Sequence, residues 1–208
     1  MMDAFFTQWR IWFRDHERMS ALLILGCILA TVYLPVVLMG KSLQAPIHRP
    51  DTVLPSGAYG YEGRRPFSAF SVDDSAASFS EYPVNKIIGD AYHRFTLPLW
   101  NPYKGVGEPL PEQLGSSAFF PYQILENIAP LALQDAFYLG RMLIAGFFTF
   151  LFLRLLKLSR TSALFGGMLY MLSGSMTWFM GNEPFSNPAM MLPVVLWGIE
   201  LAMQRATT

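Results

Sequence analysis

Residues 20–40 read SALLILGCILATVYLPVVLMG, a run without a single charged side chain. A helix needs about 20 apolar residues to cross the hydrocarbon layer of a membrane, so this run predicts a transmembrane helix. Pro35 lies near its outer end and predicts a kink there. The run is longer than the core of a signal peptide and has no small-residue cleavage site after it, so we interpret it as a retained anchor.

Three further apolar runs follow along the chain, at residues 136–156, 162–180 and 188–203. Arg141 and Arg154 interrupt the first of these, and Glu200 lies near the end of the last. Hydrophobic residues make up 52% of the chain and charged residues only 14%, a composition that favours a membrane protein. The four runs predict an all-α membrane protein with four transmembrane helices.

The placement of Lys and Arg predicts the orientation of these helices. Basic residues lie before the first run, between the second and third, and after the fourth: Arg10, Arg14, Arg18, Arg154, Lys157, Arg160 and Arg205. Residues 181–187, between the third and fourth runs, contain none. Because short cytoplasmic connections carry the positive excess, we expect a cytoplasmic N-terminus and an extracytoplasmic loop over residues 41–135. The aromatic and basic residues of segment 1–19 predict a helix in the cytoplasmic interface.

Two stretches of the long loop are expected to form interfacial helices. Near residues 80–95, apolar side chains recur at helical spacing, namely Val84, Ile87, Ile88, Ala91, Tyr92 and Phe95. This stripe predicts an amphipathic helix with Ser80 as its N-cap. A second helix is expected near residues 118–129, where Pro130 ends it. Next to a membrane, helices of this kind lie along the surface.

Asp73 and Asp74 are the first candidates for chemistry. Two adjacent acids on an outward loop are suited to bind a divalent cation, or one of them to act as a general base for an acceptor hydroxyl. The alternative is a solvated turn, the commoner use of paired acids. The formal net charge of zero gives no support for a nucleic-acid partner. The single cysteine, Cys27, permits no intrachain disulfide.

Arg141 is the second candidate, because a charge inside an apolar run is costly there. Its guanidinium either contacts a lipid phosphate or extends outward to the membrane surface. Asn182, Glu183 and Asn187 form a third group on the outward connection. They either line one cavity with the paired acids or are ordinary polar loop residues.

A series of short motifs lies between Asp73 and Arg205. In order, they are Leu97-Pro98-Leu99-Trp100-Asn101-Pro102-Tyr103, Gly107-Glu108-Pro109-Leu110, Phe119-Phe120-Pro121-Tyr122, Leu158-Ser159-Arg160, Tyr170-Met171-Leu172-Ser173-Gly174 and Leu192-Pro193. This series resembles the N-terminal part of the bacterial YfhO-like membrane protein family. The family is similar to the lipid-sugar-dependent glycosyltransferases with the C-type fold.

The resemblance implies transfer of a sugar from a polyprenyl-phosphate donor at the outer face of the bacterial inner membrane. Asp74, or Asp73, takes the position of the base or metal ligand. Trp100, Asn101 and Tyr103 then become candidates for substrate binding, with the two aromatic rings either stacking on a sugar or lying in the interfacial belt. This chain departs from the family at Ser80, where members often carry Gln.

Members of the family also continue for many more transmembrane helices. Two interpretations follow. The chain is the front of a glycosyltransferase that acts with further helices, or it is a non-catalytic accessory subunit that packs, among membrane lipids, against other membrane protein subunits. Four helices alone are not expected to be catalytic, because an active site of this fold takes groups from more of them.

Overall fold

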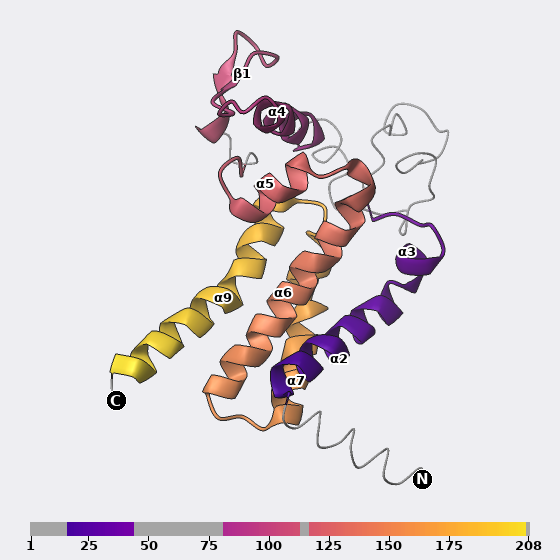
Figure 1. Ribbon diagram of the computed structural model, residues 1–208, viewed down its shortest axis with the longest axis vertical. Helices are drawn as coiled ribbons and strands as arrows, with labels where there is room; N and C mark the ends of the chain where they lie inside the picture. The colour runs from indigo at the N-terminus through magenta and orange to yellow at the C-terminus, as the bar shows by residue number, and fades with distance from the viewer. Residues whose placement is uncertain (1–15, 44–80, 113–116, 207–208) are drawn as a thin grey trace. The chain divides into compact units, whose positions relative to one another are not determined.

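The computed structural model describes residues 16–43, 81–112 and 117–206. This part of the chain is mostly helical, as predicted. Figure 1 shows the helices in chain order: α2 (Glu17–Val32), α3 (Leu34–Leu38), α4 (Tyr82–His93), α5 (Pro121–Ile128), α6 (Gln134–Leu155), α7 (Arg160–Met171), α8 (Gly174–Thr177) and α9 (Glu183–Ala206). The chain divides into two compact units, of which the first holds α2, α7 and most of α6 and α9. The second holds α3 to α5, α8 and the first turns of α6 and α9.

Two helices of the described chain are long and apolar enough to cross a membrane, by length and composition. They are Leu131–Leu155, which includes α6, and Glu183–Ala206, which is α9. The other two predicted spans are not continuous helices. The run 20–40 is divided between α2 and α3, and the run 162–180 is divided between α7 and α8.

The break in the first run has a local cause. Helix α2 ends at Val32, and α3 begins at Leu34, just before Pro35. Proline has no N–H to donate, and its ring clashes with the carbonyl four residues earlier, here that of Thr31. The sequence therefore located the kink correctly, although the structure shows a complete break in the helix.

Helix α9 is longer than the predicted span 188–203, and it contains three prolines, Pro184, Pro188 and Pro193. Pro193 cannot donate to the carbonyl of Ala189, four residues earlier. The hydroxyl of Tyr170, on α7, donates to that carbonyl at 2.8 Å. Neighbouring side chains often satisfy carbonyls freed by proline in apolar helices, and Tyr170 does so here.

We expect Tyr170→Phe to destabilise the chain by about 1 kcal/mol, because the Ala189 carbonyl loses its donor. In a Pro193→Ala background the helix can supply its own N–H, so the same Tyr170→Phe change should cost much less. Thermal unfolding of the four variants in detergent micelles measures both values. If Tyr170→Phe lowers the stability equally in the two backgrounds, the Tyr170 hydroxyl does not replace the N–H that Pro193 lacks.

Close backbone contacts hold α6 and α7 together in the first unit. A Cβ on Gly167 would lie 2.6 Å from the carbonyl oxygen of Gly146, and one on Gly146 would lie 2.8 Å from Cβ of Met171. Small residues let membrane helices approach in this way. At the C-terminal end of α6, Arg154 forms an ion pair with Glu17 of α2 at 2.5 Å.

The second unit contains α4 and α5, which lie against each other. Gly89 makes this possible, because a Cβ there would lie 2.3 Å from the backbone oxygen of Asn127. Val84 and Ile88 of α4 pack with Leu110 and Ala118 in a small apolar core. Lys86 and Asp90 occupy the exposed face of α4, so the predicted amphipathic helix is present, with bounds 82–93 rather than 80–95.

Phe95 corrects the predicted apolar stripe. It lies beyond the end of α4, has a φ of +56°, and is 98% exposed. The prediction that Phe95 continues the helix and its apolar stripe is wrong, because α4 ends at His93. Helix α4 ends at His93 because the chain turns there, and the following residues lead into an antiparallel ribbon of β1 (Trp100–Asn101) and β2 (Glu108–Pro109).

Candidate functional site

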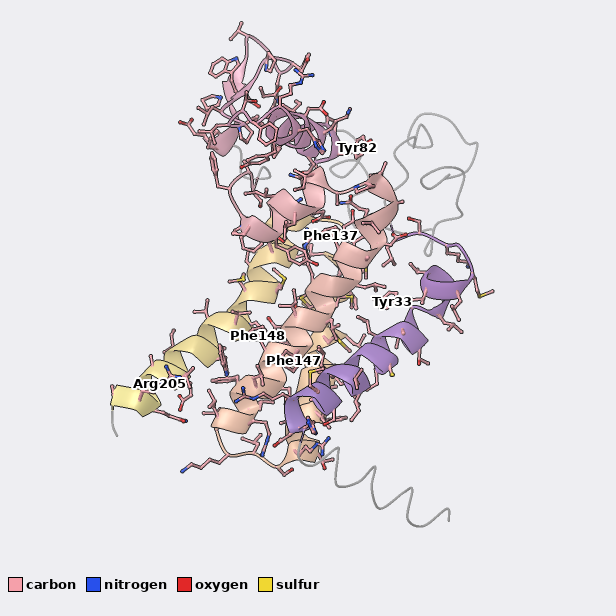
Figure 2. The ribbon with its side chains drawn as sticks, viewed as in Figure 1. Tyr33, Tyr82, Phe137, Phe147, Phe148 and Arg205 are labelled. Atoms are coloured by element: carbon pink, nitrogen blue, oxygen red, sulfur yellow. The ribbon has the colours of Figure 1, made fainter. Side chains whose placement is uncertain are left out.

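The second unit contains a buried polar cluster that involves the start of α6, the start of α9 and the whole of α5. Its members are almost fully enclosed: Gln123 and Glu126 from α5, Arg141 from α6, and Glu183 and Asn187 from α9 are each at most 4% exposed. Figure 2 labels Phe137, which lies one turn before Arg141 and marks the part of α6 that takes part in the cluster. Polar groups buried this deeply must find partners within the protein.

Arg141 is the centre of the cluster. Its Nε donates to Oδ1 of Asn187 at 2.9 Å. Nη2 donates to Oε1 of Gln123 at 2.9 Å and forms an ion pair with Glu126. Nη1 donates to the other carboxylate oxygen of Glu126 at 3.4 Å. One guanidinium therefore joins α5, α6 and α9, in the forked geometry that arginine makes with a carboxylate.

Amide side chains complete this network. Asn187 donates through Nδ2 to Oε1 of Gln123 at 3.1 Å. Gln123 in turn donates through Nε2 to Oδ1 of Asn127 at 3.0 Å. Gln134 donates to Oε1 of Glu126. The carboxylate of Glu126 thus accepts hydrogen bonds from two residues of α6, Gln134 and Arg141, and these bonds fix its position.

Two tyrosine rings enclose the guanidinium. The Cζ atom of Arg141 lies 5.3 Å from the ring centre of Tyr122 and 5.7 Å from that of Tyr138, within the range of cation–π attraction. The Tyr122 hydroxyl donates to the carbonyl of Phe137 at 2.7 Å. This approach requires Gly140, because a Cβ there would lie 2.5 Å from the Tyr122 hydroxyl oxygen.

Burial shifts the titration of the groups on α5. It raises the pKa of Glu126 to about 7, against the lowering effect of Arg141. It raises the pKa of Tyr122 to about 12, so this phenol stays neutral at physiological pH. Because the pKa of Glu126 is higher in the folded chain than in the unfolded one, the stability that this group contributes is complete below about pH 4.5 and is lost as pH rises through 7.

Glu183 extends the cluster to α4. Its carboxyl is 3% exposed and lies within hydrogen-bonding reach of the side chains of Glu81 and Asn85, and near the charge of Arg141. Within the described chain, Oε2 of Glu183, Oδ1 of Asn85 and Oγ of Ser186 are buried without a hydrogen-bond partner.

The structure brings together some of the residues that the sequence nominated. Arg141, Glu183 and Asn187 meet in the cluster, although Glu183 and Asn187 lie in the first turns of α9 and not in a connection. Asn182, which precedes the helix, is half-buried. Asp73 and Asp74 lie outside the described residues, so the structure does not place the predicted base or metal ligand.

Trp100, Asn101 and Tyr103 lie on the β1–β2 ribbon, and none of them takes part in the cluster's hydrogen bonds. Trp100 is 53% exposed and Tyr103 is 82% exposed, while Asn101 is buried and accepts from the backbone N–H of Tyr103 at 3.0 Å. A Cβ on Gly107 would lie 2.5 Å from the Trp100 ring. The ring is therefore held against the opposite strand, and Asn101 has a structural role in the turn.

Sequence reasoning missed Gln123 and Glu126. The apolar side chains of the predicted helix near 118–129 were expected to enter the membrane interface or to pack on the bundle. Helix α5 instead buries these two polar residues and leaves Leu125 56% exposed. A signal was present, because Gln123 and Glu126 are three residues apart and so share one face of a helix. An acid on that face is a natural partner for the lone Arg141 in the next apolar run.

No group of three or more His, Cys, Asp or Glu side chains suited to hold a metal ion occurs within residues 16–43, 81–112 and 117–206. Comparison with protein-family models, with curated proteins and with solved structures finds no match to this chain.

Proposed function

We propose that this chain is the front part of a membrane glycosyltransferase that takes a sugar from a polyprenyl-phosphate donor at the outer face of the bacterial inner membrane. The observation that carries the proposal is the order of elements in the second unit. The amphipathic helix α4 comes first, the Trp100–Tyr103 segment follows on an exposed ribbon, and α5 begins at Pro121. This is the order of motifs on which the resemblance to the YfhO-like family rests.

In this proposal, Arg141 supports the site and does not bind the donor phosphate. Its donor nitrogens already bond Glu126, Gln123 and Asn187, and its side chain is 1% exposed. A phosphate would have to displace a buried carboxylate to reach it. The cluster instead fixes α5 against the starts of α6 and α9, and exposed Trp100 and Tyr103 supply rings on which a sugar can stack.

The proposal is tested by a transfer assay in native membranes. Vesicles from cells with and without the gene receive a polyprenyl phosphate that carries radiolabelled hexose, and label in acceptor products is counted. We expect transfer that depends on the gene and that a divalent-cation chelator reduces if Asp73 and Asp74 hold a metal. Equal transfer in both membranes would reject the proposal for this donor.

The second candidate is a non-catalytic subunit of a larger membrane complex. The observation that favours it is the closed character of the cluster, in which Arg141 and Glu183 contact other protein groups and present nothing to a substrate. Purification from native membranes distinguishes the two functions. A stable complex that keeps its activity when Asp73 and Asp74 are both replaced by Asn would favour the subunit.

The proposed orientation predicts which positions react with a membrane-impermeant thiol reagent. In a Cys27→Ser background, Val106→Cys on the β1–β2 ribbon should label in intact spheroplasts. Lys157→Cys, between α6 and α7, should label only after the membrane is opened, because the basic connection is cytoplasmic. Both native side chains are exposed, so burial does not prevent the reaction. Labelling of Lys157→Cys in intact spheroplasts would reverse the orientation.

A further inference from the structure

Polar contacts join three helix ends at one side of the first unit. The ion pair between Arg154 and Glu17 connects the end of α6 to the start of α2. Arg160, the first residue of α7, donates through Nη2 to Oγ of Ser20 in α2 at 2.6 Å. The start of α2 therefore lies against both the end of α6 and the start of α7.

The end of α9 belongs to the same surface. Nε2 of Gln204, near the end of α9, donates to the carbonyl of Leu155 at the end of α6, at 3.1 Å. These are the ends of Leu131–Leu155 and Glu183–Ala206, the two helices that are long and apolar enough to cross a membrane. In a bilayer, the ends of such helices lie at the edge of the hydrocarbon, next to the lipid headgroups.

Basic side chains gather at this surface, which we call the basic end: Arg18, Arg154, Lys157, Arg160 and Arg205. The described residues of the first unit contain two acids, and both have partners. Glu17 is paired, as described above, and Glu200 accepts from Gln204 at 2.8 Å. Arg18 and Lys157 are exposed and form no ion pair within the described chain. Their charges are therefore available to attract an anion.

The backbone of Lys157 has a conformation that favours glycine. Its φ is +63°. The N–H groups of Lys157 and Leu158 donate to the carbonyls of Arg154 and Leu153 at 3.0 and 3.1 Å, which is the Schellman ending of a helix, where this position is usually glycine. A lysine is strained there, because its Cβ lies close to the following carbonyl oxygen. Strained residues cluster at ligand-binding and active sites, so the strain indicates a use for the Lys157 side chain.

We propose that the basic end binds the headgroup of an anionic phospholipid, and that Arg18 and Lys157 supply the charges that select it. The ends of the two long helices place these cations where lipid phosphates lie. A headgroup with a net negative charge fits an end with a positive excess, whereas a zwitterionic headgroup brings its own cation. Each Lys or Arg near an anionic membrane surface strengthens binding about fivefold. This proposal does not depend on sugar transfer.

The test uses the full chain in detergent micelles with added phosphatidylglycerol or phosphatidylcholine. Native mass spectrometry gives the apparent Kd of the first bound lipid. We expect phosphatidylglycerol to bind at least about tenfold more tightly than phosphatidylcholine, since two cations contribute. Arg18→Gln and Lys157→Gln should each weaken the binding of phosphatidylglycerol about fivefold and leave that of phosphatidylcholine unchanged. Lys157→Arg should keep the affinity of the unchanged chain.

Lys157→Gly separates the charge from the stability of the helix end. Glycine removes the backbone strain, so the Tm should rise, while the binding of phosphatidylglycerol should weaken as much as in Lys157→Gln. Arg94→Gln is the matched control, because Arg94 is an exposed arginine of the second unit and its replacement changes the net charge equally. It should bind phosphatidylglycerol as the unchanged chain does.

Three results would reject the proposal. One is equal affinity of the unchanged chain for the two lipids, and another is full affinity for phosphatidylglycerol in Lys157→Gly. The third is a loss in Arg94→Gln as large as that in Lys157→Gln, because the effect would then come from net charge alone. Displacement of phosphatidylglycerol by an equal concentration of inorganic phosphate would also overturn it, since the site would then bind a free anion and not a lipid.

Discussion

Arg141→Met should lower the free energy of unfolding by about 3–5 kcal/mol, because it leaves the carboxylate of Glu126 buried without its cation. Methionine has an unbranched side chain that can follow the path of arginine, so the loss of charge dominates over loss of volume. Gln123 and Asn187 also lose a donor, which adds to the cost. Chemical unfolding in detergent micelles, followed by circular dichroism, measures the change.

Arg154→Met is the matched control on the same helix. Arg154 also pairs with a glutamate, Glu17, but their side chains are 35% and 33% exposed. Ion pairs with that much access to solvent contribute about 1 kcal/mol or less. A comparable loss for both variants would mean that burial of the Arg141 pair is not what makes it important.

A second substitution separates charge from packing. Glu126→Gln in the Arg141→Met background removes the uncompensated charge and retains a polar group that Gln134 can bond. We expect it to restore much of the lost stability. The same Glu126→Gln change in the unaltered chain should be destabilising, because it leaves the guanidinium of Arg141 buried without its anion. This coupling is what a double-mutant cycle detects between residues in direct contact. Additive effects would contradict the ion pair as the source of the loss.

Asp74→Asn should reduce sugar transfer by a factor of about 10²–10⁴, the usual effect of removing a general base. Asp73→Asn should cost less if one acid carries the reaction, and equally much if both hold a metal ion. The measurement is transfer of labelled hexose from polyprenyl phosphate in native membranes, normalised to the amount of folded chain.

Asp90→Asn is the control for this substitution. Asp90 lies on the exposed face of α4, where it pairs with Lys86 at 3.4 Å and is 50% exposed, so its loss should leave transfer unchanged. Full transfer by the Asp74→Asn variant would show that Asp74 is not the general base of the reaction. Loss of transfer in all three Asn variants would indicate a general effect of the substitution on the loop.

Patterns among neighbouring residues predicted the helices, because helical periodicity, proline and long apolar runs act over a few turns of chain. The stripe from Val84 to Tyr92 predicted α4, because 3.6-residue periodicity places those side chains on one face. Pro35 predicted the interruption near the end of the first apolar run. Long apolar runs predicted α6 and α9, although the start of α9 at Glu183 was missed because polar residues in its first turn resemble a connection.

Only the tertiary structure decided what the polar residues do. The sequence drew attention to Arg141, Glu183 and Asn187 separately, but their partners Gln123 and Glu126 lie on another helix, 15 or more residues away along the chain. Such a network forms because a buried guanidinium must be neutralised and fully bonded, and any acid that the fold brings near can do this. Periodicity marks which face of a helix is polar, whereas packing alone determines which other polar face it meets.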